Sequence, residues 1–68
     1  MNDWSVIFET DQRYRAEIIR GLLEENGIEA VILDQKDSSY QAFGWIKIWV
    51  RNEDQEKAAS ILKSMYRE

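Results

Sequence analysis

The segment Gly44–Arg51 alternates between aliphatic and other side chains, and this pattern constrains the fold more than any other part of the chain. Successive side chains of a β-strand point to opposite sides. One face therefore carries the aliphatic Ile46, Ile48 and Val50, which predict a central core strand. The other face carries Trp45, Lys47, Trp49 and Arg51, which are difficult to cover in a 68-residue chain, since a chain of this size buries only about 60% of its unfolded surface.

Hydrophobic periodicity predicts five elements along the chain. Thr10 or Asp11 can cap the first helix, Gly27 can end it in the left-handed conformation, and Asn52 can cap the second helix. The expected elements are a strand over Trp4–Glu9, a helix over Asp11–Asn26, a strand over Ile28–Asp34, a loop over Gln35–Phe43, a strand over Gly44–Arg51 and a helix over Glu53–Tyr66.

This βαββα order predicts a single α+β domain over residues 1–68. A right-handed crossover leaves a space between the first two strands. The third strand fills that space and gives a three-stranded antiparallel sheet in the order 1-3-2, with both helices on one face. The arrangement is a ferredoxin-like split βαβ unit that lacks the usual fourth strand. The first strand is then an open edge, and the other sheet face is bare.

Two further sets of side chains are expected in the core, one on the first strand and one along the first helix. In the first strand the side of Trp4 is the better core face, and in the first helix the apolar residues recur at helical spacing. The residues expected there are Trp4, Val6, Phe8, Tyr14, Ile18, Ile19, Leu22 and Leu23.

The bare face combines two tryptophans of the central strand with aliphatic residues of both edge strands. An apolar patch of more than a few hundred Å² marks an interaction site in most proteins. Two alternatives remain open: the tryptophans lie flat on a solvated sheet under the two neighbouring cations, or the strand is turned over and buries both cations without partners. The candidate interaction face consists of Trp45, Lys47, Trp49, Arg51, Val31, Leu33 and Ile7.

The composition excludes several kinds of chemistry. The chain has no Cys and no His, so it lacks thiolate and imidazole metal ligands and the usual proton shuttle at neutral pH. Ser38 and Ser39 have no His to activate them. We therefore expect no enzyme activity, no cofactor and no metal. The N-terminus has no signal-peptide pattern and no apolar stretch reaches the ~20 residues of a membrane helix, so we expect a cytoplasmic protein without a membrane partner.

Binding of single-stranded nucleic acid is an alternative function. Phe43–Ile48 resembles the second half of the RNA-recognition-motif signature, whose strand aromatics stack on bases. Gln41 and Ala42 stand where that signature has a basic residue and a glycine, and the net charge is −4. Because phosphate contacts need a basic surface, nucleic acid is the less favoured partner. Small-molecule sensing at the loop Gln35–Phe43 is a third possibility, since long loops often carry binding residues.

The chain also resembles a known family over nearly its whole length. The segments that carry the resemblance are Phe8–Asp11, Ala16–Ile19, Leu22–Ala30, Ile48–Val50 with Asp54, and Ala58–Leu62. They resemble the small bacterial domains grouped as putative prokaryotic signal transducing proteins, which are distantly similar to nitrogen-regulatory PII proteins. The resemblance implies a ferredoxin-like regulatory or binding module in the bacterial cytosol and supplies no catalytic residues.

Together these observations predict a non-enzymatic regulatory or binding module. It would use its open sheet face or edge for self-association or for a protein partner.

Overall fold

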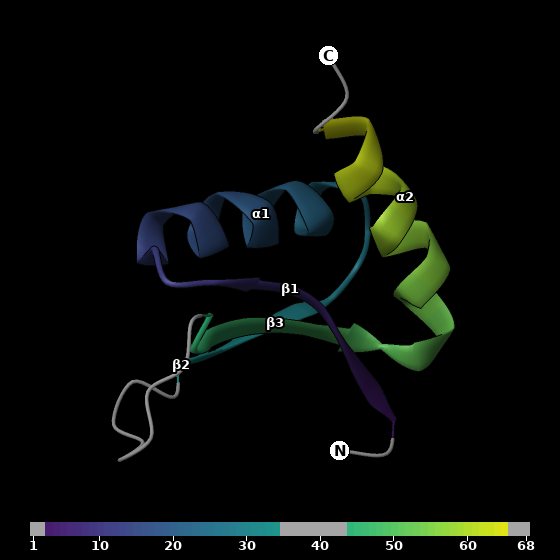
Figure 1. Cartoon of the computed structure of the whole chain (residues 1–68). Helices are drawn as coiled ribbons and strands as arrows, with labels where there is room; N and C mark the ends of the chain where they lie inside the picture. Colours follow the sequence, from purple (N-terminus) through teal and green to yellow (C-terminus); the bar gives the residue numbers. More distant parts are fainter. Residues whose placement is uncertain (1–2, 35–43, 66–68) are drawn as a thin grey trace.

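The computed structural model of the chain describes residues 3–34 and 44–65. The predicted loop Gln35–Phe43 and the end of the last helix at Tyr66 lie outside the described residues. The elements in chain order are β1 (Trp4–Thr10), α1 (Arg13–Glu25), β2 (Ala30–Asp34), β3 (Ile46–Arg51), the short 3-10 helix η1 (Asn52–Asp54) and α2 (Gln55–Met65), shown in Figure 1.

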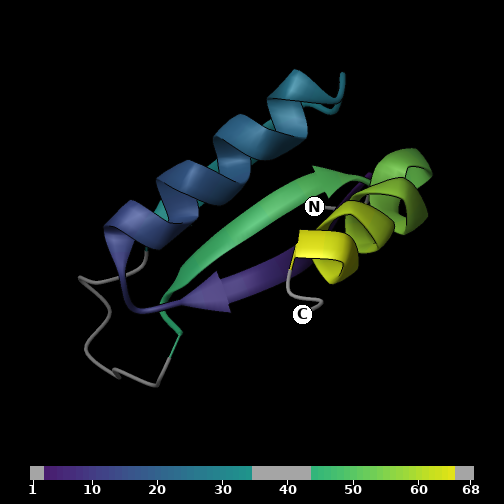
Figure 2. The same cartoon turned by 90° about the horizontal axis from the view of Figure 1, so that it is seen from above.

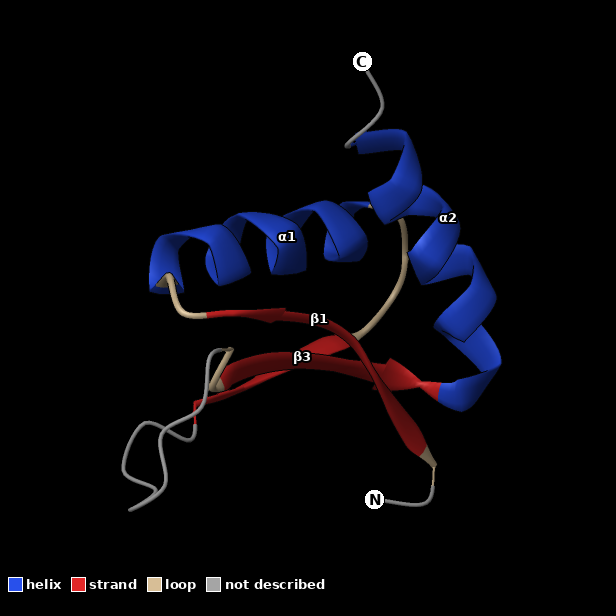
Figure 3. Ribbon diagram, in the orientation of Figure 1, coloured by secondary structure: helices blue, strands red, loops and turns tan. Residues whose placement is uncertain are grey.

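The predicted topology is confirmed. The sheet is antiparallel in the order β1-β3-β2, so β3 lies in the middle although it is the last of the three strands in sequence. Both helices lie on one face of the sheet (Figure 3). Seen from the helix side, α1 and α2 run along different directions over the strands (Figure 2). The fold is therefore the ferredoxin-like βαββα arrangement, with one sheet face left without helices.

The core lies between β3 and the helices, and it confirms the predicted facing of this strand. Ile48 and Val50 are fully buried, and Ile46 is 3% exposed. The possibility that β3 is turned over is therefore excluded. Both helices approach the sheet through an alanine, Ala16 of α1 and Ala58 of α2. The complete set of buried core residues is Ala16, Ile19, Leu23, Ile28, Ala30, Ile46, Ile48, Val50, Ala58 and Leu62.

The predicted facing of β1 is wrong in its first half. The register pairs Val6 with Trp49 and Phe8 with Ile48, so the intervening Ile7 is an extra residue, a β-bulge. A bulge places two residues of one strand opposite one residue of its neighbour and shifts the alternation. Trp4 and Val6 therefore lie on the bare face, whereas Ile7 and Phe8 pack against the core.

The predicted apolar stripe of α1 is also only partly correct. Ile19 and Leu23 are fully buried as expected. Tyr14 and Ile18, however, are 61% and 57% exposed, because the helix turns Ala16 toward the sheet instead. The helix face that contacts the sheet thus includes Ile19 and Leu23 but is rotated away from Tyr14 and Ile18.

The end of α1 follows the prediction. Gly27 has φ +80°, and its amide donates to the Glu24 carbonyl while the Ile28 amide donates to the Leu23 carbonyl, both at 3.0 Å. This pair of bonds is the Schellman arrangement, in which a glycine takes the left-handed position. Leu23 and Ile28, the two residues that the motif brings together, are both in the core.

The predicted helix starts are displaced. The residue that precedes α1 is Gln12, which makes no side-chain cap, and Thr10 Oγ1 instead accepts a hydrogen bond from the Gln12 amide at 3.1 Å. Asn52 was expected to cap the last helix but begins η1, and its Oδ1 accepts a hydrogen bond from the Ser5 hydroxyl. Residues 52–54 therefore form a 3-10 turn that ties β1 to the start of α2.

Candidate protein-interaction face

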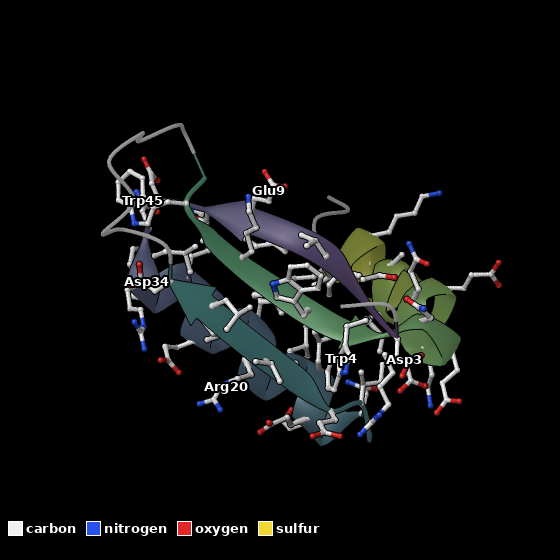
Figure 4. The ribbon with its side chains drawn as sticks, turned by 90° about the horizontal axis from the view of Figure 1, so that it is seen from below. Asp3, Trp4, Glu9, Arg20, Asp34 and Trp45 are labelled. Carbon is white, nitrogen blue, oxygen red and sulfur yellow. The ribbon has the colours of Figure 1, made fainter. Side chains whose placement is uncertain are left out.

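The sheet face without helices, here called the open face, consists of three rows of side chains that cross the strands (Figure 4). Directly paired residues of antiparallel strands point to the same side. The strand register therefore gives a central row of Val6, Trp49 and Val31. The row on one side is Glu9, Lys47 and Leu33, and the row on the other side is Trp4 and Arg51, continued by Glu29, which precedes β2.

The central row is apolar from edge to edge of the sheet. Val6 and Val31 lie directly opposite Trp49 from β1 and β2, and all three side chains are half-buried. The Trp49 indole Nε1 is out of contact with water and has no hydrogen-bond acceptor among the described residues. Buried polar groups are rarely left without a partner, so this donor is an unusual feature of the open face.

Each outer row carries one cation of β3 and one carboxylate. Arg51 bonds the Glu29 carboxylate at 3.1 Å, and its guanidinium carbon lies 4.8 Å from the centroid of the Trp4 ring. Lys47 Nζ lies 3.6 Å from the Glu9 carboxylate and donates to the Gly44 carbonyl at 3.3 Å. The two cations and two carboxylates balance, so the open face is close to neutral although the chain carries a net charge of −4.

The structure brings five of the seven predicted residues together on the open face: Lys47, Trp49, Arg51, Val31 and Leu33. Two are placed elsewhere. Ile7 packs against the core because of the bulge in β1. Trp45 also packs against the core and lies at the end of the sheet near Asp34 (Figure 4), because β3 begins only at Ile46 and the alternation does not reach it.

Sequence reasoning missed two residues of the open face, Trp4 and Val6. Each faces a predicted member, Trp4 opposite Arg51 and Val6 opposite Trp49. Strict alternation from Phe8 assigns both to the core, and nothing in the composition of Trp4–Thr10 identifies the position of the extra residue. The bulge becomes visible only from the pairing with β3.

The described residues contain neither a metal-binding cluster nor a membrane-spanning helix. In the segments 3–34 and 44–65, no group of three acidic side chains is placed to hold a metal ion, and neither helix has the length and apolar content to cross a membrane. Hydrogen bonds from Arg13 and Arg20 lower the pKa of the Glu17 carboxyl, but these three residues form an exposed network on α1.

Comparison with known proteins agrees with the resemblance found in the sequence. No curated protein and no solved structure matches the chain. A model of one protein family matches residues 4–66, which include every described helix and strand. The chain therefore belongs to the family described as putative prokaryotic signal transducing protein.

Proposed function

We propose that this protein is a non-catalytic signalling module that binds a protein partner through the open face of its sheet. The observation that carries the proposal is the apolar central row of Val6, Trp49 and Val31 on the face that no helix covers. A large aromatic at the centre of a patch with charged residues at its margins is the usual composition of a protein-binding surface.

The charges of the open face favour a protein over a nucleic acid. Single-stranded nucleic acids need a positive groove beside the stacking aromatics. Here both cations already face carboxylates, Lys47 toward Glu9 and Arg51 toward Glu29. We therefore expect a partner surface that is apolar at its centre and carries balanced charges around it. The alternative of small-molecule sensing at Gln35–Phe43 concerns residues outside those described.

Site-specific photocrosslinking in cells tests the proposal. A photoreactive amino acid at Val31, beside Trp49, is expected to give a crosslinked product with a partner protein, and the same group at the exposed Glu56 of α2 is expected to give none. A second change, Trp49→Thr, keeps a residue that favours strands and is expected to abolish the product from Val31.

The results separate the possible outcomes. Equal products from Val31 and Glu56, or a product that survives Trp49→Thr in a folded protein, would contradict the proposal. Quenching of tryptophan fluorescence by short RNA at low salt, if lost in Trp49→Thr, would assign the open face to nucleic acid instead.

A further inference from the structure

Asn26 and Gly27 form the only asparagine–glycine pair of the chain, and they lie in the turn that follows α1 (Figure 1). Asparagine is a chemically labile residue, because the backbone nitrogen of the next residue can attack its side-chain amide carbon. A glycine in the next position hinders this attack least, since it has no side chain. At Gly27 a Cβ would meet nothing within 4 Å, and both residues are exposed to water. The pair therefore has the composition and the access that the reaction needs.

Deamidation of this pair needs water as its only co-reactant. The Gly27 nitrogen forms a bond with the Asn26 Cγ, and the side-chain nitrogen leaves as ammonia with the proton of the Gly27 amide. The product of this step is a five-membered succinimide ring. Water then opens the ring at one of its two carbonyl carbons, which gives either aspartate or isoaspartate, and no group is oxidised or reduced.

The folded end of α1 holds both reacting groups in other hydrogen bonds. The Asn26 side-chain amide donates to the Leu22 carbonyl at 2.8 Å, so it is turned back toward the preceding turn of the helix. The Gly27 amide, which must lose its proton, donates to the Glu24 carbonyl at 3.0 Å. Both hydrogen bonds have to break before the Gly27 nitrogen can reach the side chain of Asn26.

The core anchors this closed arrangement one residue further along the chain. The Ile28 amide donates to the Leu23 carbonyl at 3.0 Å, and the two side chains are buried in the core, with 1% and 0% exposure. The pair of Asn26 and Gly27 therefore becomes reactive only when the end of α1 opens. Helix ends are among the parts of a protein that open locally, without unfolding of the whole domain.

We propose that Asn26 is a deamidation site of this protein, and that the hydrogen-bonded end of α1 controls its reaction. Either product weakens the closed helix end. An aspartate carboxylate cannot donate to the Leu22 carbonyl, and it adds a negative charge beside Glu24 and Glu25, at the negative end of the helix dipole. Isoaspartate adds a carbon to the main chain before Gly27 and so shifts the Gly27 amide away from the Glu24 carbonyl.

The modification also changes a surface of the helix layer. Deamidation replaces a neutral amide by a carboxylate at the edge of a groove of about 460 Å³. The residues that line this groove are Leu22, Asn26, Ser60, Ile61, Ser64 and Met65. The groove belongs to the helix layer (Figure 2), on the other side of the sheet from the open face (Figure 4). The proposal is therefore independent of what binds the open face.

Peptide mass spectrometry of the full chain, incubated at mildly alkaline pH, tests the proposal. Trypsin releases residues 21–36, in which Asn26 is the only asparagine, and a sample digested without incubation gives the background. Deamidation is expected to be at least about tenfold slower in the folded protein than in denaturant, since the helix end is closed for most of the time. Equal rates in both conditions overturn the control by the helix end, and an unmodified Asn26 in denaturant overturns the site itself.

Amide hydrogen exchange of the unmodified protein measures the opening of the helix end directly, without any substitution. The factor by which folding slows exchange of the Gly27 amide should match, within a few-fold, the factor by which folding slows deamidation of Asn26. A Gly27 amide that exchanges freely while deamidation stays slow contradicts the proposed control.

Two matched substitutions distinguish opening of the helix end from unfolding of the whole chain. Ile28→Val removes one methyl group from the anchor without altering Asn26 or Gly27, and it is expected to speed deamidation of the folded protein several-fold. Ile48→Val removes the same group from the buried face of β3 and is expected to leave the rate in the folded protein unchanged. Both variants should match the wild type in denaturant. Equal acceleration by the two substitutions, or none by Ile28→Val, overturns the control by the helix end.

Discussion

The guanidinium carbon of Arg51 lies 4.8 Å from the centroid of the Trp4 ring, while the same guanidinium bonds the Glu29 carboxylate at 3.1 Å. Arg51 is in β3, Trp4 is in the neighbouring β1, and Glu29 precedes β2. One side chain at the end of the central strand thus contacts a ring of β1 on one side and, on the other side, a carboxylate that lies just before β2.

Arg51→Gln is expected to lower the free energy of unfolding by about 1 kcal/mol, because it removes both the contact with Trp4 and the ion pair. Urea denaturation followed by tryptophan fluorescence measures the change. Glu29→Gln is the control, since it removes the exposed ion pair alone and is expected to cost only a few tenths of a kcal/mol. Equal losses in the two variants would show that the ring contact contributes nothing.

Alanine substitutions at Gly21 and Gly27 are expected to change the stability of the protein in opposite directions, although the space around the two glycines is similar. At both Gly21 and Gly27 a Cβ would meet nothing within 4 Å, but only Gly27 has positive φ, +80°. Gly27→Ala is expected to destabilise by about 1–2 kcal/mol, the cost of the left-handed conformation, and Gly21→Ala to stabilise by about 0.5–1 kcal/mol. Thermal unfolding at low protein concentration measures both, and a change of the same sign in both would refute this account.

Gly44 is expected to be less replaceable than Gly27. Its φ is +81°, and a Cβ there would lie 3.2 Å from the Glu9 Cβ. Gly44→Ala is therefore expected to cost more than the ~1–2 kcal/mol of the left-handed conformation alone. Asparagine separates the cost of the left-handed conformation from the cost of the Cβ contact with Glu9, because it tolerates that conformation but still carries a Cβ. Asparagine should be well tolerated at Gly27 and poorly at Gly44, as judged by chemical denaturation.

The ion pairs of α1 predict a pH dependence with a definite sign. Arg13 and Arg20 bond Glu17 at 3.3 and 3.0 Å and lower the pKa of its carboxyl. The folded state therefore favours the ionised form, and this contribution to stability is present above the ordinary pKa of Glu and lost as the pH falls through the lowered value. The stability difference between the wild type and Glu17→Gln should disappear in acid.

NMR titration of the Glu17 carboxyl carbon measures the midpoint directly. The double variant Arg13→Gln, Arg20→Gln is expected to raise this midpoint toward the ordinary value. An unchanged midpoint in the double variant would contradict the explanation that Arg13 and Arg20 lower the pKa of Glu17.

The order of helices and strands was predictable because several short sequence patterns indicate it independently of one another. The alternation of Ile46, Ile48 and Val50 identifies the central strand, and the glycine at position 27 ends α1 where periodicity ends. The facing of α1 was not predictable in the same way. Size favours Tyr14 and Ile18 as core residues, but close contact with a sheet favours a small side chain, and Ala16 takes that place.

The open face was predictable on β2 and β3 and not on β1. Val31 and Leu33 alternate regularly with buried neighbours, so their facing follows from spacing alone. In β1 a single extra residue reverses the facing of everything before it, and this residue is defined by pairing with β3 and not by its chemical type. The facing of Trp45 was not predictable for a related reason, since this residue lies one position before β3 begins.

The extra residue in β1 also bears on the solubility of the chain. Among the described strands β1 is an edge of the sheet, and a straight, regular edge strand is a template for uncontrolled aggregation. The bulge at Ile7 interrupts that template, as bulges at sheet edges do in other proteins. Deleting Ile7 would leave every other side chain of β1 on its present face, yet it would straighten the edge. Such a chain should keep its fold and form aggregates that the full-length strand resists.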